Sequence, residues 1–169
     1  MDKVYIETSI VSHAAARPSR DVTVAGLQQQ ARDWWANERH KFELVTSQLT
    51  LDESADGDPA AAADRLKMLQ GLPLVDINSD VEALAARLIQ AHTMPEKAAA
   101  DAVHVAAAAA AAALGGVDYL LTLNCKHIAN AHELPRIYEL LDREELGRLL
   151  ICTPAEFLGD SDDEQQSNT

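Results

Sequence analysis

Three acidic residues and one amide in this chain stand beside short apolar segments of the kind that form buried strands. Glu7 closes the first such segment, Glu53 lies in a short stretch after the second, and Asn124 follows the fourth. Asp101 lies near the start of the alanine-rich run "AAADAVHVAAAAAAAALGG", residues 98–116. If the apolar segments are parallel strands, their carboxyl ends meet at one edge of a sheet and bring these side chains into one pocket.

The chemistry of such a pocket follows from its donor atoms. Oxygen ligands without sulfur are the set that the hard cations Mg²⁺ and Mn²⁺ prefer. Carboxylates packed together repel one another and raise one another's pKa unless a cation offsets their charge, so metal binding should stabilise the fold. The matching reaction is metal-assisted phosphodiester hydrolysis, in which the ion generates hydroxide and stabilises the leaving oxygen.

Asp101 is the strongest single candidate for a metal ligand. Its neighbours at helical spacing, Ala98, Val105 and Ala108, are expected to face the sheet, and an acid buried there needs a partner or a metal. The alternative is a solvated acid on an outer helix face. His104 lies one turn further on, and we expect it to have a supporting role, because a single histidine on an apolar face is more often a satisfied core group than a ligand.

The other acids also have simpler interpretations. Glu7 could serve as a capping acid at a helix N-terminus, although a carboxylate directly after a buried strand favours a functional role. Asp52 and Glu53 share a short segment, and either one taken alone could be a solvated surface acid.

Several further residues near the predicted strand ends could assist the site. Hydroxyl groups at strand ends often hydrogen-bond carboxylates or the backbone, and three are expected to do so here: Thr8, Ser9 and Thr122. Lys126 could bind a substrate phosphate, or it could face water. Cys125 is a weak candidate for a nucleophile, because no base beyond His127 and no oxyanion hole is evident.

Alternating strand and helix patterns predict an α/β fold, a single-domain three-layer sandwich with a central parallel sheet of four or five strands. The expected helices begin at capping residues such as Ser19, Ser47 and Asp58, the last followed by proline. Trp34 and Trp35 fall in the first of these helices and are expected to pack in the core or a dimer interface, with base stacking as the alternative. The expected strands are 3–8, 42–46, 72–77, 117–123 and 148–153, and the expected helices 19–41, 47–55, 58–71, 78–92, 95–116 and 133–147.

Composition sets the outer limits of the interpretation. The 169 residues suit one domain, expected over residues 1–158, and the acidic segment 159–169 is predicted to be a disordered tail. A net charge of −13 argues against broad electrostatic binding of nucleic acid, so any such activity must depend on a local site. Two cysteines do not form a disulfide framework. No membrane span is expected, and the N-terminus lacks the layout of a secretory signal, so we expect a cytoplasmic protein.

Four segments in this order resemble the PIN-domain family, and most closely its VapC-type toxins of type II toxin–antitoxin systems. The resemblance covers about residues 2–155 and is carried by "VYIETSIVS", "VTSQLTLDES", "ADAVHVAAA" and "YLLTLNCKHIAN". It implies a metal-dependent endoribonuclease whose acidic quartet, holding Mg²⁺ or Mn²⁺, falls on Glu7, Glu53, Asp101 and Asn124. Thr8 and Thr122 match the hydroxyl positions beside the quartet. The resemblance also implies a homodimer and a small antitoxin that covers the site.

Two positions depart from the family pattern. Glu7 stands where the family usually has aspartate, and its extra methylene could shift the ion or bind it through water. Asn124 stands where aspartate is common, so only three charged ligands are left, which should weaken a second ion more than the first.

Two other functions compete with the ribonuclease. One is a catalytically weakened PIN scaffold that acts as a binding module. The other is a different metal phosphohydrolase on a small α/β fold, although such an enzyme would need an aspartate nucleophile after the first strand, where this chain has Glu7.

Overall fold

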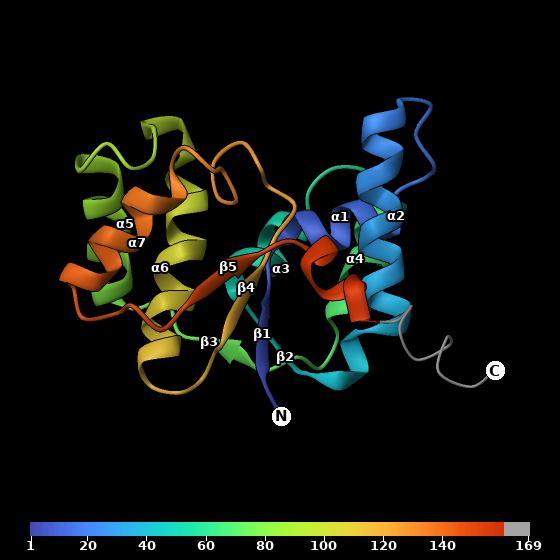
Figure 1. Ribbon diagram of the computed structural model, residues 1–169. Coiled ribbons are helices and arrows are strands. Elements are labelled where there is room, and N and C mark those ends of the chain that lie inside the picture. Colours follow the sequence, from blue (N-terminus) through green and yellow to red (C-terminus); the bar gives the residue numbers. More distant parts are fainter. Residues whose placement is uncertain (161–169) are drawn as a thin grey trace.

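The computed structural model describes residues 1–160, and its centre is a five-stranded sheet in which each neighbouring pair of strands is parallel (Figure 1). The strand order is β3-β2-β1-β4-β5, so the chain starts in the middle of the sheet and builds outward on both sides. The register places Tyr5 beside Val45 and Leu120. The strands are β1 (Lys3–Ile6), β2 (Glu43–Ser47), β3 (Leu74–Val75), β4 (Tyr119–Leu121) and β5 (Leu150–Cys152).

Helices cover both faces of this sheet and complete the predicted three-layer, PIN-like sandwich. Helices α1, α2 and α4 pack on one face, and α5, α6 and α7 on the other, as Figure 1 shows. The α-helices of the described residues are α1 (Thr8–Ala15), α2 (Val22–Asn37), α3 (Gln48–Ser54), α4 (Pro59–Leu69), α5 (Ser79–Gln90), α6 (Ala99–Ala113) and α7 (Leu134–Arg143). Short 3₁₀ helices are η1 (Arg39–Lys41), η2 (Glu96–Ala98) and η3 (Pro154–Asp160).

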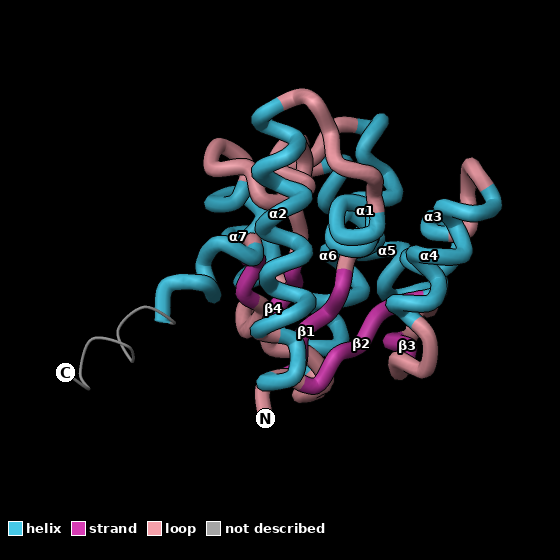
Figure 2. Tube along the Cα trace, turned by 90° about the vertical axis from the view of Figure 1, so that its right-hand side faces the viewer, coloured by secondary structure: helices cyan, strands magenta, loops and turns pink. Residues whose placement is uncertain are grey.

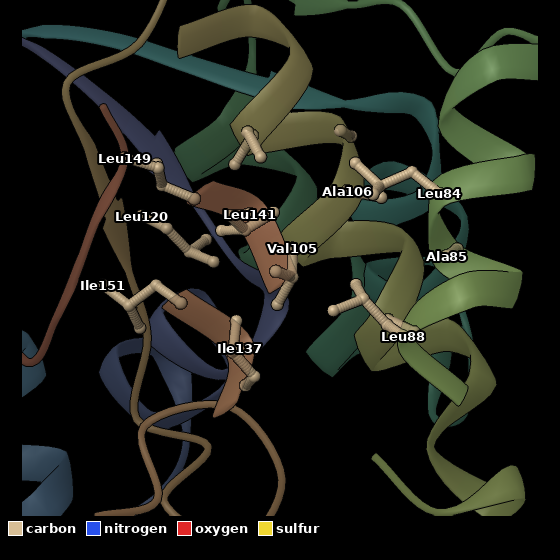
Figure 3. Packing of buried hydrophobic residues seen from close by; sticks show 14 of the residues in the cluster. Leu84, Ala85, Leu88, Val105, Ala106, Leu120, Ile137, Leu141, Leu149 and Ile151 are labelled. Atoms are coloured by element: carbon tan, nitrogen blue, oxygen red, sulfur yellow. The ribbon is translucent and has the colours of Figure 1, made fainter. Parts of the chain in front are cut away.

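The alternation of side chains along each strand divides the core in two. In β1, Val4 and Ile6 face α1 and α2, whereas Tyr5 faces α6. On the α6 side, Val105 lies near Leu120 of β4 and Leu88 of α5 (Figure 3). Trp34, fully buried, anchors the other side against Phe42 and Phe157, which confirms that it is a core residue.

Three local expectations were wrong. The segment after Glu7 was assigned to none of the expected helices and Thr8 was expected to end the first strand, yet Thr8–Ala15 form α1, which stands directly above the end of β1 in Figure 2. Helix α2 is capped by Asp21, whose carboxylate accepts from the Val24 N–H at 3.0 Å, and not by Ser19. The long alanine-rich helix opens with η2, so Asp101 lies in the first turn of α6 and not two turns into a helix.

The ends of the structure bear on two further predictions. Helix η3 extends to Asp160, past the predicted domain limit at residue 158. The predicted tail lies, over residues 161–169, outside the residues that the structure describes. Within residues 1–160, no helix combines the length and apolar character needed to cross a bilayer.

Replacing the observed cap of α2 should cost more stability than replacing the predicted one. Asp21→Ala is expected to lower the free energy of unfolding by about 1 kcal/mol, because the Val24 N–H loses its partner. Ser19→Ala, the matched control, should change it by less than about 0.5 kcal/mol. Urea denaturation followed by circular dichroism measures both, and an equal loss in the two variants would contradict the assignment.

Candidate functional site

The acidic residues lie at the carboxyl edge of the sheet, as predicted from the strand ends. Glu7 follows β1 directly, is 4% exposed, and caps α1 by accepting from the Ser9 N–H at 3.1 Å. The same carboxylate oxygen, Oε2, accepts from the hydroxyl of Thr122 at 2.8 Å and from that of Ser9. The capping interpretation of Glu7 is therefore confirmed, and the carboxylate is held in a fixed orientation at the strand end.

The hydroxyls of Ser9 and Thr122 also join the start of α1 to the loop after β4. Ser9 Oγ accepts from the Leu123 N–H at 2.8 Å, and Thr122 Oγ1 accepts from the Asn124 N–H at 2.9 Å. Both residues thus bond a carboxylate and the backbone, as predicted for hydroxyls at strand ends. The position of Glu7 is set by two strands rather than by its own helix alone.

Glu53 is brought to the same edge by α3, which follows β2. Its Oε1 accepts from the Thr8 hydroxyl at 2.7 Å and lies 2.5 Å from His104 Nε2. Burial alone would raise the pKa of Glu53, but the bonds from His104 and Thr8 together outweigh it, and the pKa falls below its usual value. The ionised form of Glu53 is therefore the favoured one.

His104 links Glu53 to polar side chains in the core. It is completely buried, and its Nδ1 lies 2.7 Å from the Tyr5 hydroxyl, which in turn lies 2.7 Å from Ser47 Oγ. Both ring nitrogens of His104 therefore have an oxygen partner, Nε2 with Glu53 and Nδ1 with Tyr5. The supporting role predicted for His104 is thus a link between a surface carboxylate and buried polar groups of two strands.

Asp101 lies across from this pair, half-buried in the first turn of α6. Burial raises its pKa above the usual value, and the negative charge of Glu53 adds to the rise. The amide of Asn124 and the imidazoles of His127 and His104 act in the opposite direction without cancelling the rise. Asp101 therefore sits where a positive charge would be favourable.

The side-chain oxygen of Asn124 is used in a hydrogen bond within its own loop. Its Oδ1 accepts from the His127 N–H at 3.1 Å, and its backbone carbonyl accepts from Ile128 and Ala129. The Asn124 amide is also a neighbour that lowers the pKa of Asp101 against the effect of burial. Its role as a metal ligand stays a prediction.

Glu7 and Glu53 each have one carboxylate oxygen that accepts no hydrogen bond from the protein. Within residues 1–160, the hydrogen bonds to Glu7 end on Oε2 and those to Glu53 end on Oε1, so Oε1 of Glu7 and Oε2 of Glu53 accept none. The donor set of three carboxylates and an amide fits a hard divalent cation. In the same part of the chain, no group of three or more Asp, Glu, His or Cys side chains is already arranged to hold a metal ion.

The remaining candidates lie outside this group. Lys126 is exposed on the loop beyond Asn124 and contacts none of the three carboxylates. Cys125 is exposed and Cys152 is buried, and both are free thiols. Burial raises the pKa of Cys152 to about 12, which keeps it protonated.

Tyr5, Ser47 and His127 were not predicted as part of the site. A signal for Tyr5 was present, because a buried tyrosine hydroxyl needs a partner and alternation along β1 turns Tyr5 away from the face of Val4 and Ile6.

Comparison with models of known protein families, with curated proteins and with solved structures finds no match to this chain. The fold is PIN-like, and the interpretation of the site depends on its own geometry.

Removing the Tyr5 hydroxyl should destabilise the fold without creating a cavity. Tyr5→Phe leaves His104 Nδ1 and Ser47 Oγ without their shared partner, and is expected to lower the free energy of unfolding by about 1–3 kcal/mol. Tyr119→Phe is the matched control, because that hydroxyl only contacts Asp2 at 3.5 Å on the surface. Equal stability of the two variants in urea titrations would show that the buried chain of hydrogen bonds is absent.

Neutralising Asp101 should stabilise the protein in a buffer that contains a chelator. The pKa of Asp101 is raised on folding, so its ionised form opposes folding above that pKa, and the effect vanishes below the ordinary value of 3.8. Asp101→Asn should therefore have the higher free energy of unfolding at pH 7, with the difference shrinking as the pH falls toward 3.8. Asp52→Asn, at an exposed position, should show no such trend. A less stable Asp101→Asn at pH 7 would contradict this account.

Proposed function

We propose that this protein is a Mg²⁺- or Mn²⁺-dependent endoribonuclease, the toxin of a toxin–antitoxin pair. The observation that carries the proposal is the set of carboxylates at the sheet edge, Glu7, Glu53 and Asp101, which come from three different elements. Glu7 and Glu53 are each anchored by one oxygen and keep the other. Anchoring one oxygen of a carboxylate while presenting the other is how proteins orient metal ligands.

Each anchored side chain has its own positioning partners. Thr122 and Ser9 hold Glu7, whereas Thr8 and His104 hold Glu53. A divalent ion held by these carboxylates would supply an activated water and a counter-charge for the leaving oxygen. The raised pKa of Asp101 supports the proposal, because it comes mainly from burial of the carboxylate and a bound cation would offset the cost of keeping that carboxylate ionised.

The charge of the ligand set favours one ion over two. Glu7, Glu53 and Asp101 carry three negative charges, and the neutral Asn124 adds none. Since each divalent cation needs offsetting charge, a second ion would bind more weakly than the first.

The proposed partners are an RNA substrate, a second copy of the chain and a small cognate antitoxin, all within the cytoplasm. The acidic body of the chain suits a basic segment of an antitoxin. The alternative function is a PIN scaffold that binds partners without cleaving.

Loss of a ligand carboxylate should abolish RNA cleavage. Asp101→Asn and Glu53→Gln are each expected to lower the Mg²⁺-dependent rate by at least about a hundredfold, because metal-ligand charge contributes several kcal/mol to the transition state. Asp52→Asn, next to Glu53 but exposed, should retain activity. Gel assays on structured cellular RNA with Mg²⁺, Mn²⁺ or chelator provide the measurement.

Calorimetry separates the two functions. Binding of Mg²⁺ or Mn²⁺ that disappears in Asp101→Asn supports the nuclease. No metal binding, no cleavage and unchanged behaviour of Asp101→Asn would overturn it in favour of the binding module.

A further inference from the structure

A cavity of about 480 Å³ opens beside the carboxylate site, between the segment that joins α5 to α6 and the loop that joins β4 to α7. Four side chains that carry or can acquire positive charge line it: His92, Lys97, Lys126 and His127. Its volume lies in the range of pockets that hold small ligands or single groups of larger ones.

The two lysines of this basic cavity are not neutralised by neighbouring acids. Among residues 1–160, no carboxylate lies within 4.0 Å of the Lys97 or Lys126 amino group. The acid that lines the cavity, Glu133, lies 3.9 Å from Arg136 instead. In a chain with a net charge of −13, two uncompensated lysines at one cavity form a local site for an anion.

Hydrogen bonds fix both walls of the basic cavity. On one side, the Leu88 carbonyl at the end of α5 accepts from the N–H groups of Thr93 and Met94, at 3.2 and 3.3 Å, and from the Thr93 hydroxyl. On the other side, Asn130 donates to the Lys126 carbonyl at 3.0 Å. His92 has φ +55°, in the left-handed region that L residues rarely adopt. The basic groups are therefore carried on ordered backbone.

His127 connects the basic cavity to the carboxylate site. It lines the cavity, and its backbone N–H donates to Asn124 Oδ1 at 3.1 Å. Lys97 lies in η2, which leads directly into the turn of α6 that carries Asp101. An anion in the cavity would lie next to any substrate held over the carboxylates.

We propose that the basic cavity binds a backbone phosphate of the RNA strand adjacent to the phosphate that is cleaved. Lys97 and Lys126 supply the charge, and His92 and His127 supply ring N–H donors. An acidic protein needs such a local contact, because phosphate neutralisation by cationic side chains provides most of the non-specific affinity for nucleic acid. This inference rests on the proposed nuclease function, and it adds the subsite that holds the substrate.

Binding can be tested apart from cleavage. All variants are made in full-length Asp101→Asn protein, and the affinity for a fluorescein-labelled single-stranded 2′-O-methyl oligoribonucleotide is measured by anisotropy at several salt concentrations. Lys97→Glu and Lys126→Glu are each expected to weaken binding by about tenfold, as for the removal of a charged hydrogen bond. The slope of log affinity against log salt should fall by about 0.7 for each lysine–phosphate pair that is removed. Lys67→Glu, the same charge change on exposed α4, should leave the slope unchanged.

The outcomes separate this inference from the proposed function. If Lys97→Glu and Lys126→Glu behave like Lys67→Glu while the wild-type chain cleaves RNA, the cavity assignment is overturned and the nuclease stands. If the protein neither binds the oligonucleotide nor cleaves RNA, both are overturned. If the two lysine variants lose binding of a polyglutamate peptide but keep binding of the oligonucleotide, the cavity serves an acidic protein partner and the inference is wrong.

Discussion

The close packing of α6 between the sheet and α5 is the constraint on which the site depends. Residues 106–109 of this helix are alanines that are at most 1% exposed, so the helix is covered on nearly every side. A helix can lie this deep only if its side chains are small, because interiors are packed to the density of crystals and larger side chains would force the layers apart. Alanine also has the highest helix propensity, so the same residues that permit close packing stabilise the helix itself.

A polar residue on such a helix must find partners within the protein. His104 is completely buried one turn after Asp101, and an unpartnered imidazole there would lose its hydrogen bonds to water with nothing in return. Tyr5 from β1 and Glu53 from α3 provide those bonds. The burial of one side chain thereby connects the middle strand, the helix after β2 and the long helix, and it orients Glu53 at the sheet edge.

The sequence was a good guide where a single local signal acted. Ser47 and Asp58 cap α3 and α4 as predicted, because a capping side chain needs nothing beyond its own helix. The parallel sheet and the position of the acids at its edge also followed from apolar segments and the residues that end them. Glu7 was singled out in this way, since strand ends of a parallel sheet share an edge. Asp101 was singled out by the helical spacing of its apolar neighbours, and Glu53 only by the resemblance to the PIN-domain family.

Prediction failed where two local signals competed or where the partner was distant. Ser19 and Asp21 are both of the residue types that cap helices, and the sequence pattern does not fix which of them stands at the first turn of α2. Helix α1 was missed because a short apolar run after a strand does not reveal whether it continues extended or coils. The link from Tyr5 to His104 joins residues 99 positions apart, and the cavity around Lys97 and Lys126 joins two loops. Such contacts follow from topology, which no local pattern contains.

The negative and the positive side chains around the site lie in different places. Negative side chains lie at the carboxyl ends of β1 and β2, whereas Lys97 and Lys126 line the cavity between the α5–α6 segment and the loop after β4. His127 lines that cavity and bonds Asn124, so a polyanion that spanned both places would be attracted to the lysines and would need a cation at the carboxylates. An extended strand of phosphates would therefore enter such a site in a fixed register, with the carboxylates aligned to one phosphate and the lysines to a neighbour.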